Sequence, residues 1–133
     1  MRIKKEQKKY LAFILMISGL LIAYICINFS NGWIFVKINN KTYVANSSKR
    51  YKEIEGNQIG VTHYNQIDFL KPTRNNGSNI LPYGCIFYEG EEDNEIFMKV
   101  KDQYIKLVSI ENKEWKNGDK VTLADLELIK IDE

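Results

Sequence analysis

The sequence predicts a small all-β domain, an antiparallel sandwich or barrel-like meander, preceded by a single N-terminal transmembrane α-helix. Two observations lead to this fold class. Residues 10–29 contain no charged side chain, and the residues after them form short β-branched and aromatic runs separated by Asn- and Gly-containing turns. The chain has 133 residues, 44% hydrophobic and 27% charged, so it has room for one domain besides the helix.

The apolar stretch over residues 10–29 has the length of a membrane span. A helix rises about 1.5 Å per residue, so such a stretch covers about 30 Å, the thickness of the bilayer hydrocarbon core. Residues 1–9 form a stub with five basic side chains and one acidic side chain. Because basic flanks stay on the cytoplasmic side, we expect a single-pass protein of the cell membrane with residues 30–133 outside.

The same segment has two other interpretations. A cleaved signal sequence has a shorter apolar region and a small-residue cleavage site, and a lipoprotein signal has small residues before its cysteine. Here Cys26 follows Tyr24 and Ile25, so an uncleaved anchor is favoured. A core helix of a soluble protein would need apolar partners all round, which the polar remainder does not supply. Tyr10 and Trp33 either mark the two membrane interfaces or, for Trp33, begin the folded domain.

Charge and cysteine content exclude several classes of function. The first nine residues carry a net +4, so the rest of the chain carries −2 of the overall +2. A near-neutral outer domain argues against nucleic-acid binding. No cluster of His and Cys suggests a metal site, the acidic run 89–95 lacks the order of a calcium loop, and no cofactor is expected. Cys85 with His63 is a weak signal for a thiol hydrolase, so no enzymatic activity is expected.

The outer domain is expected to begin with a hairpin. Residues 33–38 and 41–44 are aromatic and β-branched, and Asn39 and Asn40 between them tolerate the positive φ of a tight turn. Residues 45–55 are polar and suit a loop or a short helix. Residues 58–64 are expected to form a strand, with Gly60 at a bulge.

The second half of the domain is expected to be a meander. Residues 84–88, 96–100 and 104–110 alternate in the manner of strands, with an acidic turn over residues 89–95. Residues 121–131 are compatible with helix or strand, and we assign them to a strand.

Residues 72–79 give the strongest loop signal, Pro-Thr-Arg-Asn-Asn-Gly-Ser-Asn. Loops on a rigid scaffold often bind ligands, so this segment and a nearby tyrosine are the candidate binding loop. Its residues are Pro72, Arg74, Asn75, Asn76, Ser78, Asn79 and Tyr83. The tyrosines of the domain could also form a recognition surface, although tyrosine is equally common in strands.

The order of these features resembles small membrane-anchored or lipoprotein domains of low-GC Gram-positive bacteria. The matching stretches are KINNKTYV (37–44), NQIGVTHY (57–64), PTRNNGSN (72–79), GCIFYEG (84–90) and IFMKVKDQYIKL (96–107). The chain departs from the family in having no lipobox. The family has no established activity, so the resemblance implies fold and location and no catalytic residue.

The expected function is therefore that of a binding or interaction module. The partners would be the lipid bilayer and an envelope protein or peptide. Two alternatives remain: a subunit of a membrane complex that associates through a small-residue helix face at Ser18, Gly19 and Ala23, or a cysteine-dependent envelope hydrolase.

Overall fold

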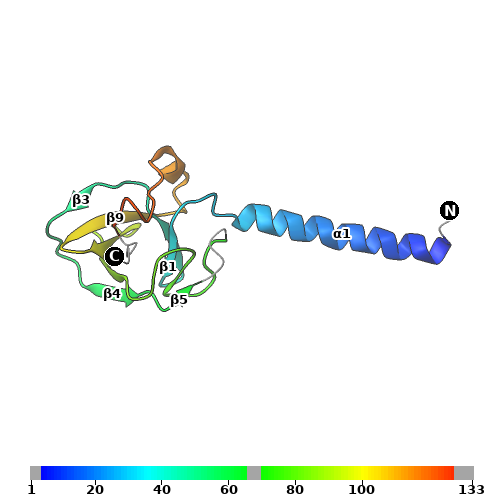
Figure 1. The fold of residues 1–133 in the computed structure, drawn as a ribbon, viewed down its shortest axis with the longest axis horizontal. Helices are drawn as coiled ribbons and strands as arrows, with labels where there is room; N and C mark the ends of the chain where they lie inside the picture. Colours follow the sequence, from blue (N-terminus) through cyan, green and yellow to red (C-terminus); the bar gives the residue numbers. More distant parts are fainter. Residues whose placement is uncertain (1–3, 66–69, 128–133) are drawn as a thin grey trace, which may run out of the picture.

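The structure is a computed structural model that describes residues 4–65 and 70–127. A single helix, α1 (Lys5–Asn28), projects from a compact β domain (Figure 1). Its segment Lys5–Ile25 is long and apolar enough to span a membrane, and no part of the apolar window is buried by the rest of the protein. The expected architecture, one N-terminal apolar helix followed by an all-β domain, is confirmed.

The domain is built from nine short strands and one 3-10 helix in the described part of the chain. Their bounds are β1 (Phe35–Ile38), β2 (Lys41–Val44), β3 (Arg50–Tyr51), β4 (Gln58–Val61), β5 (Tyr64–Asn65), β6 (Gly77–Ser78), β7 (Ile86–Glu89), β8 (Glu95–Val100), β9 (Gln103–Ser109) and η1 (Lys113–Asn117). Eight strands follow the order β4-β7-β8-β9-β2-β1-β6-β5, and β3 also pairs with β9. The two ends of this path, β4 and β5, are separated in the chain only by Thr62 and His63. The sheet therefore curls back on itself as a small barrel (Figure 1).

The predicted first hairpin and bulge are confirmed. β1 and β2 pair antiparallel up to Ile38 and Lys41, and the turn residues Asn39 and Asn40 have φ of 50° and 66°. Both central residues at positive φ match the twist of a tight hairpin. The β4–β7 register shifts between Gln58 and Gly60. A Cβ at Gly60 would lie 2.7 Å from Asn76 Oδ1 and 3.1 Å from Ile38 Cδ1, so a larger residue there would displace these side chains.

The predicted meander is β7–β8–β9, and its side chains alternate between the two faces of the barrel wall. Phe87, Met98, Ile105 and Leu107 belong to the main buried core. Phe97, one residue from Met98, points the other way and is covered from outside by Tyr51 of β3. The interior is therefore filled by alternate residues of each strand, as in other small barrels.

The strand expected over residues 58–64 is interrupted at Thr62 and His63, which separate β4 from β5, and two further segments also differ from their predictions. Residues 45–55 form a connection that includes the short strand β3. Residues 121 and 122 are irregular and residues 123–127 form turns. The strand expected over 121–131 is therefore wrong for its described part, and 128–131 lie outside the described residues. The reason is local: Thr122 N donates to Asp125 Oδ2 (2.9 Å) and Asp125 N to Thr122 Oγ1 (3.1 Å), which closes a turn.

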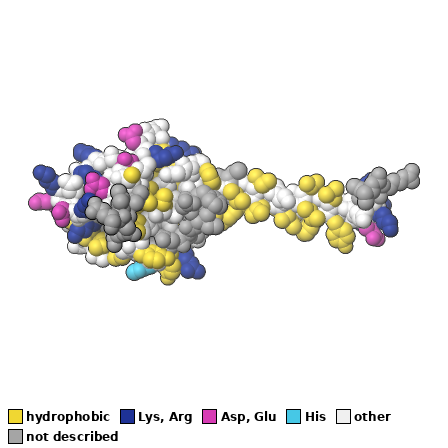
Figure 2. All heavy atoms as spheres, in the orientation of Figure 1, with side chains coloured by type: hydrophobic (Ala, Val, Ile, Leu, Met, Phe, Trp, Pro, Cys, Tyr) yellow, Lys and Arg dark blue, Asp and Glu magenta, His cyan; other side chains and the backbone are white. Residues whose placement is uncertain are grey.

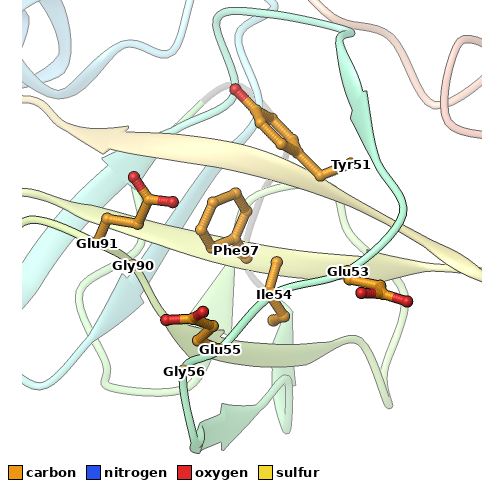
Figure 3. Close-up of a pocket in the computed structure, with 8 residues that line it drawn as sticks. All are labelled: Tyr51, Glu53, Ile54, Glu55, Gly56, Gly90, Glu91 and Phe97. Carbon is orange, nitrogen blue, oxygen red and sulfur yellow. The ribbon is translucent and has the colours of Figure 1, made fainter.

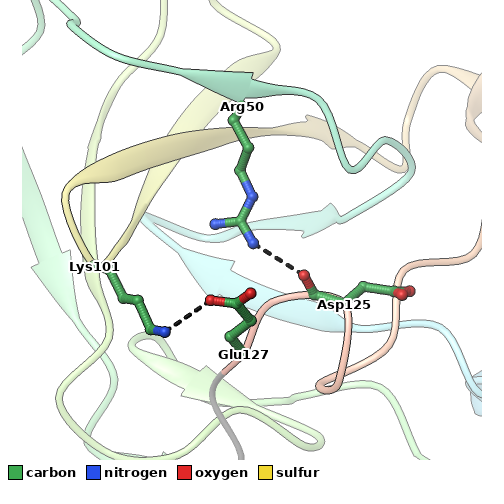
Figure 4. Close-up of polar contacts among 4 residues, drawn as sticks. All are labelled: Arg50, Lys101, Asp125 and Glu127. Carbon is green, nitrogen blue, oxygen red and sulfur yellow. Dashed lines mark hydrogen bonds and ion pairs between the residues drawn. The ribbon is translucent and has the colours of Figure 1, made fainter.

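This C-terminal turn is tied to the barrel by two long basic side chains (Figure 4). Arg50 donates to the Asp125 carbonyl (2.9 Å), and Lys101 Nζ contacts Glu127 Oε2 (2.7 Å). Lys101 lowers the pKa of the Glu127 carboxyl by hydrogen bonding to it and by its charge. Leu126 between the two contacts is fully buried, so the turn closes one end of the core.

Candidate binding site

The candidate loop divides into an exposed part and a buried part. Arg74 and Asn75 are exposed, and Asn76 is half-buried at φ 63°. Pro72, Ser78 and Asn79 are buried. The segment after Asn76 is therefore strand β6 against β1, a correction to the expected loop over 72–79.

The exposed part is fastened to the first hairpin. Asn75 Oδ1 accepts from Asn40 N (2.7 Å), and Asn75 Nδ2 donates to Asn40 Oδ1 (3.0 Å). The Asn76 carbonyl accepts from His63 N (2.8 Å) and Tyr64 N (3.3 Å). The asparagines thus hold the loop in place between the two ends of the sheet.

Ser78 and Asn79 have internal partners. Ser78 Oγ donates to the Phe35 carbonyl (2.7 Å). Asn79 Oδ1 accepts from Phe35 N (2.9 Å), and its Nδ2 donates to the Trp33 carbonyl (2.8 Å). These side chains provide hydrogen-bond partners for buried backbone groups at and just before the start of β1. The two-residue strand β6 is too short to pair with that part of the chain.

Two members of the candidate loop, Arg74 and Tyr83, lie on an aromatic surface. The Arg74 guanidinium is 5.1 Å from the centroid of the Tyr64 ring. Tyr64 and Tyr83 are 43% and 65% exposed, and among the described residues after Phe29 they are the two large hydrophobic side chains exposed to this degree. Together with the neighbouring His63 they form the tyrosine–arginine surface (His63, Tyr64, Arg74 and Tyr83).

Thr62 brings the two chain segments of this surface together. Its Oγ1 donates to the Pro82 carbonyl (2.7 Å) and accepts from Cys85 N (2.9 Å), and its carbonyl accepts from Gly84 N (3.0 Å). The pair His63–Tyr64 is thereby held beside Tyr83. The sequence analysis placed Arg74 and Tyr83 in the candidate binding loop and counted Tyr64 among the tyrosines of the alternative recognition surface. It did not predict His63 as a binding residue.

The environment of Cys85 opposes a reactive thiolate. The residue is 8% exposed, and burial raises the pKa of its thiol, with the Thr62 hydrogen bond acting weakly in the other direction. His63 is exposed on the surface. A nucleophilic cysteine needs a lowered pKa and a base beside it. The pKa of Cys85 is raised instead.

Apart from the tyrosine–arginine surface, a pocket of about 540 Å³ lies on the barrel wall (Figure 3), and we call it the acidic pocket. Its floor is the edge-to-face pair Tyr51 and Phe97, with ring centroids 5.2 Å apart. Glu53, Glu55 and Glu91 stand around it, from the β3–β4 connection and the β7–β8 turn. No three His, Cys, Asp or Glu side chains in the described part of the chain are grouped so as to hold a metal ion.

The pocket was not predicted, because its walls come from two segments that lie far apart in the chain. The two segments approach closely at Gly56, where a Cβ would overlap the Glu89 carbonyl oxygen.

Comparison with protein-family models, curated proteins and solved structures found no match. Function is therefore inferred from the geometry of these surfaces.

Proposed function

We propose that this protein is a single-pass membrane protein that presents its barrel outside the cytoplasm as a binding module for an envelope polypeptide. One observation carries the proposal: α1 is apolar enough over Lys5–Ile25 to span a membrane, and the barrel covers none of the apolar window. The described core of the domain includes no residue of α1. The domain therefore packs without the helix.

The energetics favour lipid around α1. Its Leu, Ile, Phe and Met side chains are largely exposed. Each large apolar side chain gains about 1.5–3 kcal/mol on leaving water, so the helix as a whole gains on the order of tens of kcal/mol. Basic residues 4, 5, 8 and 9 before the apolar segment favour a cytoplasmic N-terminus.

The tyrosine–arginine surface is the proposed binding site. Tyrosine offers a large contact area at low entropic cost, and the rings of Tyr64 and Tyr83 are the most exposed aromatic area of the described domain. Arg74, stacked on Tyr64, adds a planar cation suited to carboxylate or backbone acceptors of a polypeptide.

Orientation is tested by labelling intact cells with a membrane-impermeant maleimide. The exposed Ser48→Cys variant, made together with Cys26→Ala and Cys85→Ala, is expected to react without permeabilisation, and Lys5→Cys in the same background only after it. Labelling of Ser48→Cys only after permeabilisation would show that the barrel is inside.

The binding site is tested with a photo-crosslinking amino acid at Tyr83, with the exposed position Lys99 as the matched control. We expect a polypeptide adduct from position 83 that weakens in the Tyr64→Ala variant. The same adduct from both positions would contradict the assignment. Replacing the apolar segment with polyleucine distinguishes binding through the barrel from association through the helix. Loss of the adduct in that variant would indicate that the partner contacts α1. Gly19 of α1 has no neighbour within 4 Å among the described atoms, so this face of the helix is open to such a contact.

A further inference from the structure

A second aromatic group covers the outside of the barrel where the chain enters from α1. Trp115 of η1 meets Trp33 edge-to-face at 5.1 Å between ring centroids, and Phe35 at 5.6 Å. Phe35 and Trp115 are buried, and Trp33 is half-buried. With Val44, these rings form a small core separate from the barrel interior. Trp33 therefore begins the folded domain.

A lysine ammonium group lies over each of the three rings of this group. Lys71 Nζ is 5.5 Å from the centroid of Phe35, Lys116 Nζ is 5.6 Å from Trp115, and Lys120 Nζ is 5.6 Å from Trp33. We call these three rings and three lysines the lysine–aromatic cluster. Figure 2 shows basic side chains on the domain beside η1, on the side toward the helix.

Two ammonium groups of the cluster, those of Lys71 and Lys116, are close enough for one to act on the other. Burial lowers the pKa of Lys71, and the charge of Lys116 lowers it further. Three lysine ammonium groups lie over one aromatic group, and the acidic side chains of Glu114 and Asp119 are their neighbours in the chain. Such a group of cations favours an anion that can contact several ammonium groups together.

The cluster is fixed close to the end of the helix. Trp33 lies five residues beyond the last residue of α1, Asn28, a reach of at most about 17 Å. Phe29 pairs with Leu70, the neighbour of Lys71, in an isolated β-bridge. Lys120 Nζ donates to the Asn31 carbonyl (2.7 Å), and Trp33 N donates to the Ser30 carbonyl (3.0 Å). The segment between helix and cluster is thus held by the domain itself.

We propose that the lysine–aromatic cluster is a membrane-docking surface, which binds the anionic phosphate headgroups of the leaflet from which α1 emerges. The occupant follows from position: a helix that spans the bilayer brings the cluster to the headgroup layer. The chemistry fits, because the half-buried indole ring of Trp33 suits that depth and lysines near an anionic membrane each add to the attraction. The inference depends on the proposed membrane span and adds the lipid class and the residues that bind it.

The chain's two tryptophans, Trp33 and Trp115, both belong to the cluster, so intrinsic tryptophan fluorescence reports on this surface alone. The full-length protein is reconstituted into vesicles of phosphatidylcholine, with or without a minor fraction of phosphatidylglycerol, that carry a headgroup spin-label quencher. We expect stronger tryptophan quenching in the anionic vesicles, lost on raising the salt concentration. Each of Lys71→Gln, Lys116→Gln and Lys120→Gln should weaken docking by roughly fivefold.

The matched control neutralises three lysines elsewhere on the domain, Lys49, Lys52 and Lys99, by substitution with Gln. Circular dichroism of all variants checks that the barrel is folded, and single substitutions of the control lysines serve if the triple control variant is not folded. Equal quenching in neutral and anionic vesicles, or equal loss in the control, would overturn the docking surface. Failure of the protein to float with either type of vesicle would instead refute the membrane span.

Discussion

The two sides of the barrel wall use the same packing arrangement with opposite charge. On one side Phe35 faces outward and is covered by Trp115 of η1; on the other Phe97 faces outward and is covered by Tyr51 of β3. Three lysines lie over the first group, whereas three glutamates and one lysine, Lys49, stand around the second. The first adjoins the end of α1, so the positive side is the one closest to the proposed membrane.

The comparison shows how a small barrel can carry two separate surfaces. The interior uses alternate residues of each strand, and an outward aromatic under a covering segment adds burial without disturbing that interior. The charges around each aromatic are then determined by the covering segment and its neighbours. The two surfaces can therefore be weakened one at a time.

Trp115→Ala should have the largest effect on stability. The side chain is 7% exposed and contacts both Trp33 and Phe35, so truncation leaves a cavity over β1. A loss of about 3–5 kcal/mol in the free energy of unfolding is expected. Urea unfolding of the full-length protein in lipid nanodiscs, followed by circular dichroism, measures it.

Phe97→Ala is the counterpart on the acidic side. Phe97 has one edge-to-face partner, Tyr51, which is itself only half-buried, so its loss should be smaller than that of Trp115→Ala. The same urea unfolding measures both. A larger loss for Phe97→Ala would reverse the comparison and make the acidic side the better packed of the two.

Asn79→Ala should come next. The Asn79 side chain accepts a hydrogen bond from Phe35 N and donates one to the Trp33 carbonyl, next to the lysine–aromatic cluster. Its truncation leaves these two backbone groups without that partner. An unsatisfied buried group costs about 1–3 kcal/mol. The control is Asn57→Ala, an exposed asparagine just before β4, expected to change stability by less than about 0.5 kcal/mol. Equal effects from both, by the same unfolding measurement, would contradict the role of Asn79.

The parts of the fold that sequence predicted depend on local signals. Asn39 and Asn40 tolerate positive φ, Gly60 permits a close approach, and the meander strands alternate along their own length. Strand β6 escaped prediction because Gly77 and Ser78 have turn propensity, and their pairing with β1 and β5 makes them a strand. The turn at Thr122–Asp125 was missed because a local side-chain hydrogen bond outweighs a weak apolar pattern.

The candidate site was predicted in part for the same reason. Arg74 and Tyr83 follow from an Asn-rich loop and an adjacent tyrosine, which sequence shows directly. Tyr64 joins them only because the two ends of the sheet meet at Thr62. The acidic pocket and the lysine–aromatic cluster each combine segments that are distant in the chain, so neither pattern exists along the sequence.

The smallest expected effect is a shift in the titration of Lys71. Its pKa should lie below the ordinary lysine value of about 10.4, first because of burial and second because of Lys116. The unfolded chain then binds more protons between the lowered pKa and the ordinary one, so this residue makes stability rise with pH through that window. Lys116→Gln removes the lesser cause, and the pKa of Lys71 should rise while staying below the ordinary value. NMR titration of ¹³C-methylated lysines measures both, with Lys99→Gln as the control. If the pKa of Lys71 does not change in Lys116→Gln, the two ammonium groups do not interact electrostatically. The lysine–aromatic cluster and the acidic pocket would then differ in residue composition but not in the electrostatic coupling of their charges.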